Sequence, residues 1–416
     1  MIEKPKVLYV VGLCLYNNTS ANMSHNAFIK GFIENSYEVD IIMPDNSWGA
    51  RDNKLKKLNA NYFEYQFYSY ADRLRVKFSY ANPQRNQKDE RSIQAKENKV
   101  ENKVIKNSLR EFFKKCFYSI FKTDPRYGRE VTWLKKAQNY YCEQEYDLVV
   151  SNSCPEASHK LVLLLTEKNR IKYRRWIQIW EDPWYYDLYG GHTLAEKEEE
   201  HFLLKRASEV YYVSPLTLMY QKKFYADCAD KMKCVPLPFL EYEEQSAEKP
   251  IQGSFGYFGD YYSVTRNLIP FYNALKGSGY KGFIYGDNDL NLQSTEGIEV
   301  SGRVTLDILS GIQGKTEILV HLCNLKGGQI PGKIYHYSAT TKPILFILDG
   351  TEDEKRELFN FFSKFDRYYF CENNEEDILS TMRKIINERK VFEPVKEFSP
   401  KEIVRKIIDE EEVVVH

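Results

Sequence analysis

The sequence has 416 residues, which is more than one compact core usually organises and suits two domains of ordinary size. Its 59 basic and 59 acidic residues cancel to a formal net charge of zero, which argues against a globally basic nucleic-acid-binding protein. Its eight cysteines show no C-x-x-C spacing, so we expect neither a zinc site nor a disulfide framework, and a reducing cytoplasm fits best.

The chain opens with an apolar run, Val7 to Val11, that is too short for a signal-peptide core and predicts a first strand. A helical pattern follows from Ser24 to Ile33, and Val39 to Met43 predicts a second strand that Pro44 stops. No run reaches the about 18 apolar residues that a transmembrane helix needs. We therefore expect a cytoplasmic protein.

A polar insertion interrupts this alternation at about 83–122. Its first part, Pro83 to Lys103, is charged and has no apolar period, which indicates a mobile segment. Its second part, Ile105 to Lys122, predicts a helix with an aromatic face and a basic face. Two interpretations remain open: the helix docks on an anionic membrane surface near a lipid-linked acceptor, or it packs on its own domain.

The alternation of strand and helix then resumes and continues to the end of the chain. An acidic, aperiodic segment from Glu241 to Pro250 predicts a linker between two blocks of similar size. Further strands are predicted at Leu148–Val150, Trp176–Trp180, Val210–Val213, Phe255–Phe258, Gly282–Ile284, Ile318–Leu322, Ile344–Ile347 and Tyr368–Phe370. Helices are predicted at Ser158–Thr166, Ala195–Ala207, Gly332–Ala339, Glu375–Ile386 and Pro400–Ile408.

This pattern predicts an α/β fold of two facing Rossmann-like domains with a cleft between them. We expect the first domain at 1–240 and the second at 251–395. We expect the closing segment, 396–416, to pack its helix back on the first domain. In open parallel sheets, ligands bind at the carboxyl ends of the strands, so the cleft is the predicted site.

In the second block, two segments have the composition of an anion site. Gly259 follows a strand directly, which permits close approach of backbone N–H groups to a phosphate, and Arg266 supplies a forked charge. Gly332 and Lys333 stand where a helix would begin, and His336 follows one turn later on the same face. The alternative for both segments is an ordinary turn or αβ unit with incidental polar residues.

In the first block, polar residues follow the predicted strands. Asp182 could orient hydroxyls of a ligand or stabilise positive charge on it, and Trp184 could stack on a ring; the alternative for Asp182 is an ordinary turn with Pro183. His159 fits either a catalytic role or a core histidine. Asn18 and Ser20, in the first loop, could bind acceptor hydroxyls or cap the following helix.

A D-x-D sequence, Asp287-Asn288-Asp289, has a form that can hold a metal and a diphosphate. Here it follows Gly286, and Asp, Asn and Gly are turn-forming residues, so we expect a turn at this place. We expect no metal and no other cofactor.

The segment from Gln329 to Leu345 fits the pattern Q-I-P-G-K-I-Y-x-Y-x-A-x-x-K-P-I-L. It resembles the nucleotide-sugar segment of the GT-B glycosyltransferases, in particular the large retaining family four, and within it members that build capsule, exopolysaccharide or O-antigen chains. The resemblance covers most of the chain. Glu181-Asp182-Pro183-Trp184 resembles the family's R-D-P-W sequence, and Gly259, Arg266 and Asn267 resemble its G-x-x-x-x-x-R-N donor-domain opening.

One departure from the family concerns its two glutamates, which are separated by seven residues. Their positions hold Gly328 and His336 in this chain. The second glutamate normally receives the ribose hydroxyls, and a neutral histidine can accept one hydrogen bond and donate another. A carboxylate is the stronger acceptor. The substitution therefore bears directly on donor identity, affinity and activity.

The resemblance implies a metal-independent transferase of hexosyltransferase type that takes a nucleotide-sugar as substrate. Its donor-binding residues are Gly259, Arg266, Gly332, Lys333 and His336, its catalytic residues Asp182 and His159, and its acceptor-binding residues Asn18, Ser20 and Trp184. The expected acceptor is a saccharide, lipid-linked, in surface polysaccharide synthesis, which would place the protein at the inner face of the cell membrane. Two alternatives remain: a non-catalytic binding subunit of the same fold, and a nucleotide-sugar epimerase.

Overall fold

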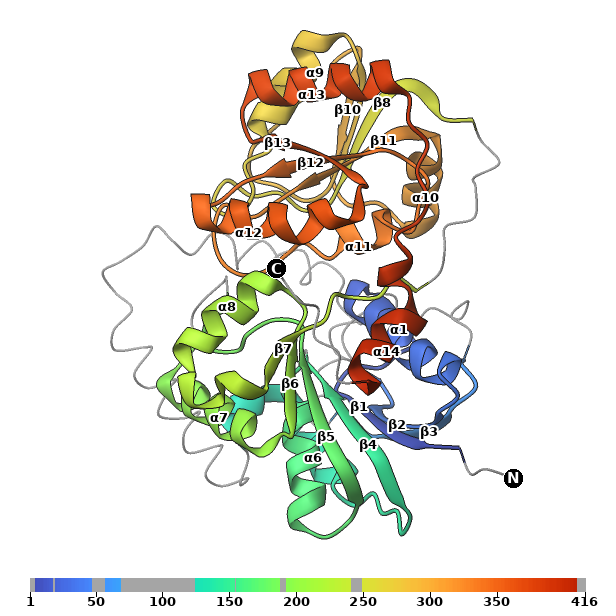
Figure 1. Ribbon diagram of the computed structural model, residues 1–416, viewed down its shortest axis with the longest axis vertical. Helices are drawn as coiled ribbons and strands as arrows, with labels where there is room; N and C mark the ends of the chain where they lie inside the picture. Colours follow the sequence, from blue (N-terminus) through green and yellow to red (C-terminus); the bar gives the residue numbers. More distant parts are fainter. Residues whose placement is uncertain are drawn as a thin grey trace, which may run out of the picture.

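The computed structural model describes residues 4–17, 19–46, 57–68, 124–153, 155–187, 192–240 and 249–409. They form two α/β domains, and Figure 1 shows the second domain stacked above the first. The predicted insertion at about 83–122 and most of the predicted linker lie outside these residues. Within the described part, none of the helices has the length and apolar content needed to cross a bilayer.

The first domain is built on a seven-stranded sheet in which every pairing is parallel. The strand order is β3-β2-β1-β4-β5-β6-β7. The strands are β1 (Lys6–Val11), β2 (Glu38–Pro44), β3 (Asn61–Tyr65), β4 (Glu145–Asn152), β5 (Lys172–Trp180), β6 (Glu209–Tyr212) and β7 (Met232–Cys234).

The second domain has a six-stranded sheet, also parallel throughout. Its order is β10-β9-β8-β11-β12-β13. The strands are β8 (Ile251–Phe258), β9 (Lys281–Tyr285), β10 (Ile298–Ser301), β11 (Thr316–Leu322), β12 (Ile344–Leu348) and β13 (Tyr368–Glu372).

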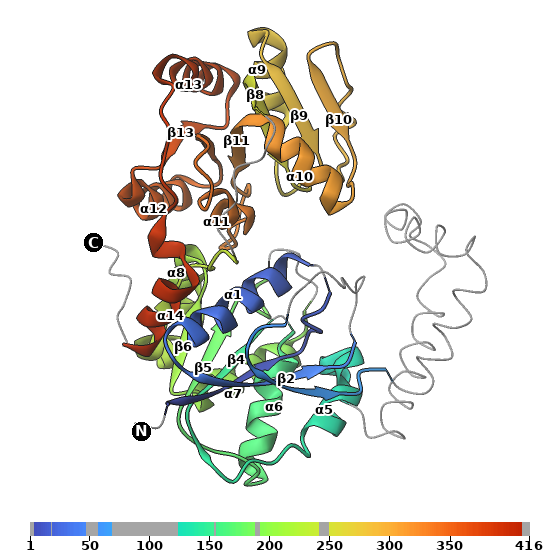
Figure 2. The ribbon, with the colours of Figure 1, turned by 90° about the vertical axis from the view of Figure 1, so that its right-hand side faces the viewer.

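Helices cover both faces of each sheet, so the central strands are buried on both sides (Figure 2). This is why central strands such as β1 and β12 are almost continuously apolar and easy to recognise from sequence. The helices of the first domain are α1 (Ser20–Glu34), α5 (Val131–Ala137), α6 (Ala157–Glu167), α7 (Leu194–Arg206) and α8 (Pro215–Phe224). Those that follow β8 are α9 (Ile269–Ser278), α10 (Leu306–Lys315), α11 (Lys333–Tyr337), α12 (Glu352–Phe362), α13 (Glu375–Glu388) and α14 (Pro400–Ile408).

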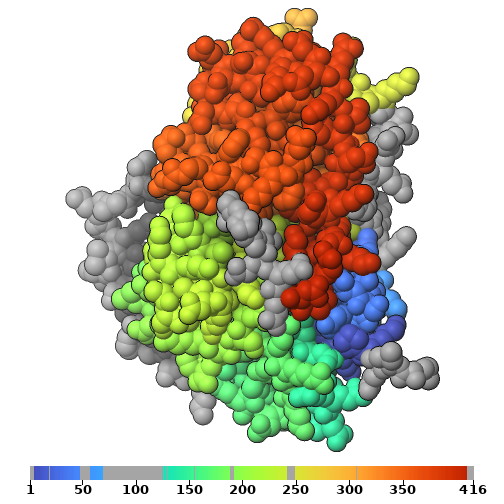
Figure 3. Space-filling view, in the orientation of Figure 1, coloured from blue at the N-terminus to red at the C-terminus, as the bar shows by residue number. Residues whose placement is uncertain are grey.

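The last helix, α14, lies on the first domain beside α1, as Figures 1 and 2 show from two directions. Figure 3 shows the red surface of this segment next to the blue surface of the first residues. Its apolar side is fully buried, and the side chain of Asn35 donates to the carbonyl of Lys401 at 2.9 Å. The chain therefore crosses between the domains twice.

The two domains share an apolar core across their junction. One continuous cluster of buried side chains includes Phe239 from the first domain, Tyr335 from the second and Phe398 from the returning segment. The rings of Tyr335 and Phe398 are 5.2 Å apart, edge to face. Each domain also has a separate core on the far face of its sheet.

The predicted fold class is confirmed: two parallel sheets with covering helices form two Rossmann-like domains. One predicted element differs from expectation. The helix expected at Gly332–Ala339 is the shorter α11, for which Gly332 is the N-cap residue.

Candidate functional site

A cavity of about 280 Å³ lies at the carboxyl ends of the second domain's strands. Residues after β8, β10 and β11 and the start of α11 line it, and Ser20 at the start of α1 contributes from the first domain. The cavity therefore lies at the junction of the two domains, which is where open parallel sheets bind ligands. Its lining is Ser20, Tyr257, Phe258, Gly259, Asp260, Tyr262, Arg266, Arg303, Val320, His321, Leu322, Pro331, Gly332, Lys333 and Tyr337.

Three cationic side chains face this cavity: Arg266, Arg303 and Lys333. Arg303 is bound to the carboxylate of Asp260 through two nitrogens. Partial burial alone would raise the pKa of Asp260, but the hydrogen bonds from Arg303 and from the backbone N–H of Asp287, together with the charges of Arg303 and Arg266, outweigh burial and lower it. With three cations against one carboxylate, the cavity has a net positive charge suited to an anion.

Arg266 is held in position by hydrogen bonds at both ends of its guanidinium. Its Nε donates to Oδ1 of Asn324 at 2.8 Å, and its Nη1 donates to the carbonyl of Asp260 at 2.8 Å. The amide of Asn324 in turn donates to the carbonyl of Gln329 at 2.9 Å. Arg266 is therefore fixed before any ligand arrives, and its position depends on the segment that precedes α11.

Lys333 has no ion pair or hydrogen bond among the described residues. Partial burial lowers the pKa of its ammonium to about 8; the charge of Asp260 opposes this shift, and the nearby guanidinium groups of Arg303 and Arg266 add to it. A half-buried cation that repels two neighbouring cations is costly until an anion neutralises it. Lys333 is thus the least compensated charge of the cavity wall.

The segment before α11 docks directly on the first domain. The carbonyl of Gly328 accepts hydrogen bonds from the hydroxyls of Ser214 and Thr217, the latter at 2.9 Å. The amide of Gln329 donates to Asp182 at 2.6 Å and to Asp187 at 2.8 Å. These contacts connect the wall of the cavity to the carboxyl end of the first domain's sheet.

The two positions that carry glutamate in the resembled family have distinct surroundings here. A Cβ at Gly328 would lie 2.8 Å from the backbone N and Cα of Thr217, so no larger side chain fits without moving α8. Burial, with the neighbouring Lys333, lowers the pKa of His336 to about 4. His336 is therefore a neutral imidazole at physiological pH, able to donate one hydrogen bond and accept another.

Five of the predicted site residues meet at the cavity: Ser20, Gly259, Arg266, Gly332 and Lys333. A Cβ at Gly259 would be 3.9 Å from Nη1 of Arg266, which shows how closely the backbone and the guanidinium approach. His336 lies one turn further along α11 and is not part of the lining. Their roles in binding stay predictions.

Asp182 lies at the domain junction, where its carboxylate is held by Gln329. Burial raises its pKa, the hydrogen bond from Gln329 opposes this, and the charge of Asp187 adds to the rise. Its neighbour Glu181 has a carboxyl pKa raised well above the usual value by burial and by the charge of Asp182. Glu181 and Asp182 therefore form an acidic side of the junction.

Two predicted site residues of the first domain lie in its interior. His159 has no exposed surface: its Nδ1 is 2.8 Å from the hydroxyl of Ser151, and its ring packs on Trp180 at 4.3 Å. Burial lowers its pKa to about 3. Trp184 is 4% exposed and packs on Tyr127 with ring centroids 5.5 Å apart.

Asn18 and the amphipathic segment at Ile105–Lys122 fall outside the described residues, so their predicted roles stay predictions. The same holds for the membrane interpretation of that segment.

The sequence analysis did not single out Arg303, Asp260 or Asn324. Arg303 follows the carboxyl end of β10 and Asn324 that of β11, which is the signal that could have identified both. The short, partly polar β10 has too weak a pattern to be recognised as a strand.

The D-x-D segment forms a turn, as its composition predicted. The side chain of Asn288 accepts from the backbone N–H groups of Leu290 and Asn291, and Asp289 accepts from the backbone and hydroxyl of Ser263. Asp287 accepts from the backbone N–H of Arg303, so both carboxylates are bound by protein groups of neighbouring loops.

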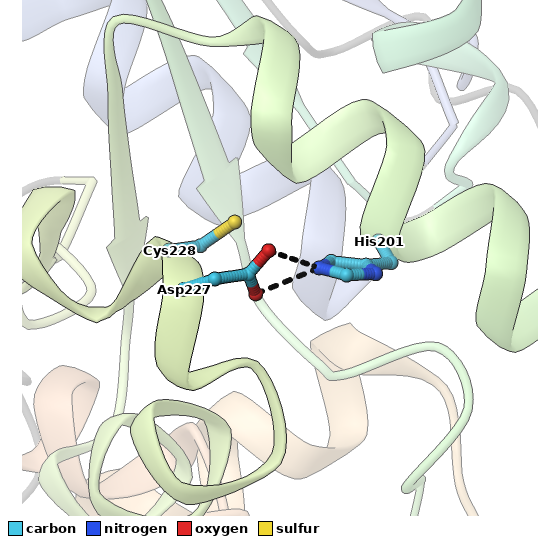
Figure 4. Close-up of side chains that lie close together, drawn as sticks. All are labelled: His201, Asp227 and Cys228. Carbon is cyan, nitrogen blue, oxygen red and sulfur yellow. Dashed lines mark hydrogen bonds and ion pairs between the residues drawn. The ribbon is translucent and has the colours of Figure 1, made fainter.

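Among the described residues, one group has the spacing to hold a metal: His201, Asp227 and Cys228. Figure 4 shows the carboxylate of Asp227 facing the imidazole of His201, with Nε2 at 2.8 Å from Oδ1. The ammonium of Lys205 is 2.9 Å from the same carboxylate. Because that cation already neutralises Asp227 and would repel a divalent ion, the group is better described as an ion-pair cluster.

A scan of protein-family models and a search of curated proteins found no match for this chain. Solved structures match it over nearly its full length. A glycosyltransferase from Rickettsia africae aligns with a TM-score of 0.53 at 12% identity, covering 97% of this chain and 94% of that one. The chain has the GT-B fold.

Two further GT-B structures support this assignment. The sucrose-phosphate synthase of Thermosynechococcus elongatus aligns with a TM-score of 0.51 at 9% identity, covering 97% of this chain and 94% of that one. Anabaena HepE in complex with UDP aligns with a TM-score of 0.50 at 11% identity, covering 98% and 95%. At these identities the likeness concerns the GT-B fold alone.

Proposed function

We propose that this GT-B protein is a glycosyltransferase that moves a sugar from a nucleoside diphosphate to a saccharide acceptor. The observation that carries the proposal is the cationic cavity of Arg266, Arg303 and Lys333 at the carboxyl ends of the second domain's strands. The UDP bound to the structural neighbour HepE supports a nucleotide at this kind of cleft.

The chemistry follows from where charge develops. When the bond between the anomeric carbon and the diphosphate breaks, negative charge accumulates on the leaving diphosphate. Arg266 and Lys333 would stabilise that charge more strongly in the transition state than in the ground state, which is what lowers a barrier. Arg266 is preorganised by Asn324, so little reorganisation accompanies the reaction.

Positive charge develops at the same time on the anomeric carbon. We assign its stabilisation to the acidic side of the junction, where Gln329 holds Asp182. The resemblance to family four supports a retained anomeric configuration and a reaction without metal. It also supports a lipid-linked acceptor in surface polysaccharide synthesis at the inner face of the membrane.

Nucleotide binding is the first test. We expect UDP, measured by isothermal titration, to bind the wild type and to bind Lys333→Ala about 10- to 100-fold more weakly, the loss typical of a charge-assisted hydrogen bond. Lys281→Ala is the matched control, because Lys281 is exposed at the opposite end of β9. Failure of UDP and of the other nucleoside diphosphates to bind would contradict the proposal.

A second candidate is a non-catalytic subunit of the same fold. The specific observation that favours it is Gly328, whose tight contact with Thr217 leaves no room for the family's first glutamate. Release of UDP from UDP-sugars, measured with and without lipid-linked acceptor, separates the two. Turnover that requires the acceptor supports a transferase, whereas binding without turnover supports the subunit.

A further inference from the structure

The segment between β11 and α11 carries a series of hydrogen bonds that runs from one domain to the other. Within the second domain, Nε of Arg266 donates to Oδ1 of Asn324 at 2.8 Å, and Nδ2 of Asn324 donates to the carbonyl of Gln329 at 2.9 Å. The amide Nε2 of Gln329 then donates to Asp182 at 2.6 Å and to Asp187 at 2.8 Å in the first domain. Gln329 is therefore bound to its own domain through its backbone and to the other domain through its side chain.

On the side of the second domain, the side chain of Asn324 is fixed at both ends. It is 7% exposed, its oxygen accepts from Arg266 and its nitrogen donates to Gln329. The next residue, Leu325, donates its backbone N–H to the carbonyl of Thr265 at 2.8 Å. If the carbonyl of Gln329 moved, the Asn324 amide would lose its acceptor or rotate after it, and either change disturbs the acceptor of Arg266.

On the side of the first domain, two carboxylates share one amide nitrogen. The two protons of the Gln329 amide allow it to donate to Asp182 and Asp187 at once, and a carboxylate is a stronger acceptor than a neutral group. The loop that carries Asp187 is itself anchored, because the ring of Tyr186 stacks on Phe224 of α8 with centroids 3.5 Å apart and an interplanar angle of 15°. The side chain of Gln329 is thus held at a firm point of the first domain.

The residue before Gln329 is held by the first domain as well. The carbonyl of Gly328 accepts from the hydroxyls of Ser214 and Thr217, at the start of α8. Gln329 does not line the cationic cavity, whereas Arg266 does. An influence of Gln329 on an anion in the cavity therefore passes through the residues that it holds in place.

We propose that Gln329 is a positioning residue that ties the guanidinium of Arg266 to the carboxylates of Asp182 and Asp187. The inference rests on the proposed function, in which Arg266 binds the diphosphate of the nucleotide. Its backbone carbonyl sets Arg266 by way of Asn324, and its side chain fixes that carbonyl relative to the first domain. The affinity of the second domain for a nucleotide consequently depends on contacts with the first.

The first test compares substitutions that remove or keep the donor at this place in the full chain. Gln329→Met has a side chain of similar length without the amide, whereas Gln329→Lys keeps a donor for the two carboxylates. We expect the Kd for UDP, measured by isothermal titration, to rise about 5- to 10-fold in Gln329→Met and less than about threefold in Gln329→Lys. Gln293→Met is the matched control, because Gln293 is exposed in the same domain and its amide donates to the carbonyl of Asn291. Equal losses in Gln329→Met and Gln329→Lys, or no loss in Gln329→Met, would overturn the proposal.

A double variant distinguishes positioning from a general loss of structure. Arg266→Ala removes the group through which Gln329 is proposed to act. We therefore expect Gln329→Met to raise the Kd of Arg266→Ala for UDP by less than about twofold, since the two changes share one effect. If the two losses multiply instead, Gln329 acts independently of Arg266 and the proposal is refuted.

A measurement without ligand keeps this inference distinct from the proposed function. In the free protein with isotope-labelled arginine, NMR follows exchange with water of the Arg266 Nε–H, which is bonded to Asn324 and is assigned by its absence in Arg266→Lys. We expect this exchange to be at least about tenfold faster in Gln329→Met and unchanged in Gln293→Met. If no nucleoside diphosphate binds, the proposed function fails, and faster exchange in Gln329→Met still supports the positioning of Arg266. Unchanged exchange would refute that positioning whether or not UDP binds.

Discussion

Among the three cations of the cavity, Lys333 is the one whose charge changes most with pH. Its ammonium is half-buried near Arg303 and Arg266 and has a pKa of about 8, whereas the two guanidinium groups stay charged throughout the physiological range. An anion that binds next to Lys333 favours the protonated form. Affinity for that anion must therefore fall as the free protein loses this proton.

We expect the Kd for UDP to rise roughly fivefold from pH 8 to pH 9, the factor by which the protonated fraction of a group with pKa near 8 decreases. Lys333→Arg keeps its charge over this range and is expected to remove most of the rise. Isothermal titration at the two pH values measures both proteins. An identical pH profile for the two would show that Lys333 does not contact the nucleotide.

At the level of single residues, the sequence predicted part of the candidate site. Gly259, Arg266, Gly332 and Lys333 follow strands or begin a helix, so their positions could be predicted from local pattern. The hydrogen bonds from Arg303 to Asp260 and from Arg266 to Asn324 could not. These partners are far apart in sequence, and which side chains meet depends on packing that no local pattern encodes.

Two elements of different domains, α8 and the segment before α11, meet at Gly328. Ser214 caps the first turn of α8 by accepting from the backbone N–H of Thr217, and the hydroxyls of both residues donate to the carbonyl of Gly328. One turn further along α8, Tyr220 donates to Glu354 at 2.9 Å, and Glu354 closes the capping box of α12. The two domains are thus held together by contacts from α8 to Gly328 and to the first turn of α12.

We expect Gly328→Ala to destabilise the protein by about 1–3 kcal/mol, since the added Cβ collides with the backbone of Thr217. Gly311→Ala, within α10, is the control: a Cβ there meets nothing within 4 Å, and alanine favours a helix by about 1 kcal/mol over glycine. Urea unfolding measures both variants. Equal effects would mean that the contact between α8 and Gly328 does not hold the domains.

The predicted strands agree closely with the observed ones because buried parallel strands are continuous apolar runs. The sequence analysis missed several elements, among them α8 and α12, and β3, which is an edge strand with half-exposed residues. The helices α8 and α12 lie at the domain junction and β3 lies at the sheet edge, so contacts with other parts of the molecule decide their structure. The local sequence pattern alone predicts such elements poorly.

The whole molecule is held together by the return of α14 to the first domain. Ile403, Val404 and Ile407 are fully buried in the cluster that spans the junction. Gly31 on α1 permits this approach, because a Cβ there would lie 2.2 Å from the carbonyl oxygen of Pro400. Stability of the first domain therefore depends on the last described helix.

We expect Ile407→Ala to cost about 2–5 kcal/mol, the range for removing a buried aliphatic side chain, and to increase amide hydrogen exchange in α1. Val391→Ala is the control, because Val391 is 81% exposed and should change stability by less than about 0.5 kcal/mol. Thermal unfolding and exchange measured by mass spectrometry test both. Unchanged exchange in α1 would show that the two helices are not coupled.

The packing of α14 on α1 also has a consequence for protein synthesis. As the chain leaves the ribosome, the apolar side of α1 emerges early, yet the residues that cover it are translated after the second domain. The first domain must therefore wait through translation of the entire second domain with this side uncovered. A nascent chain in that state is a natural substrate for a chaperone that recognises exposed apolar surface.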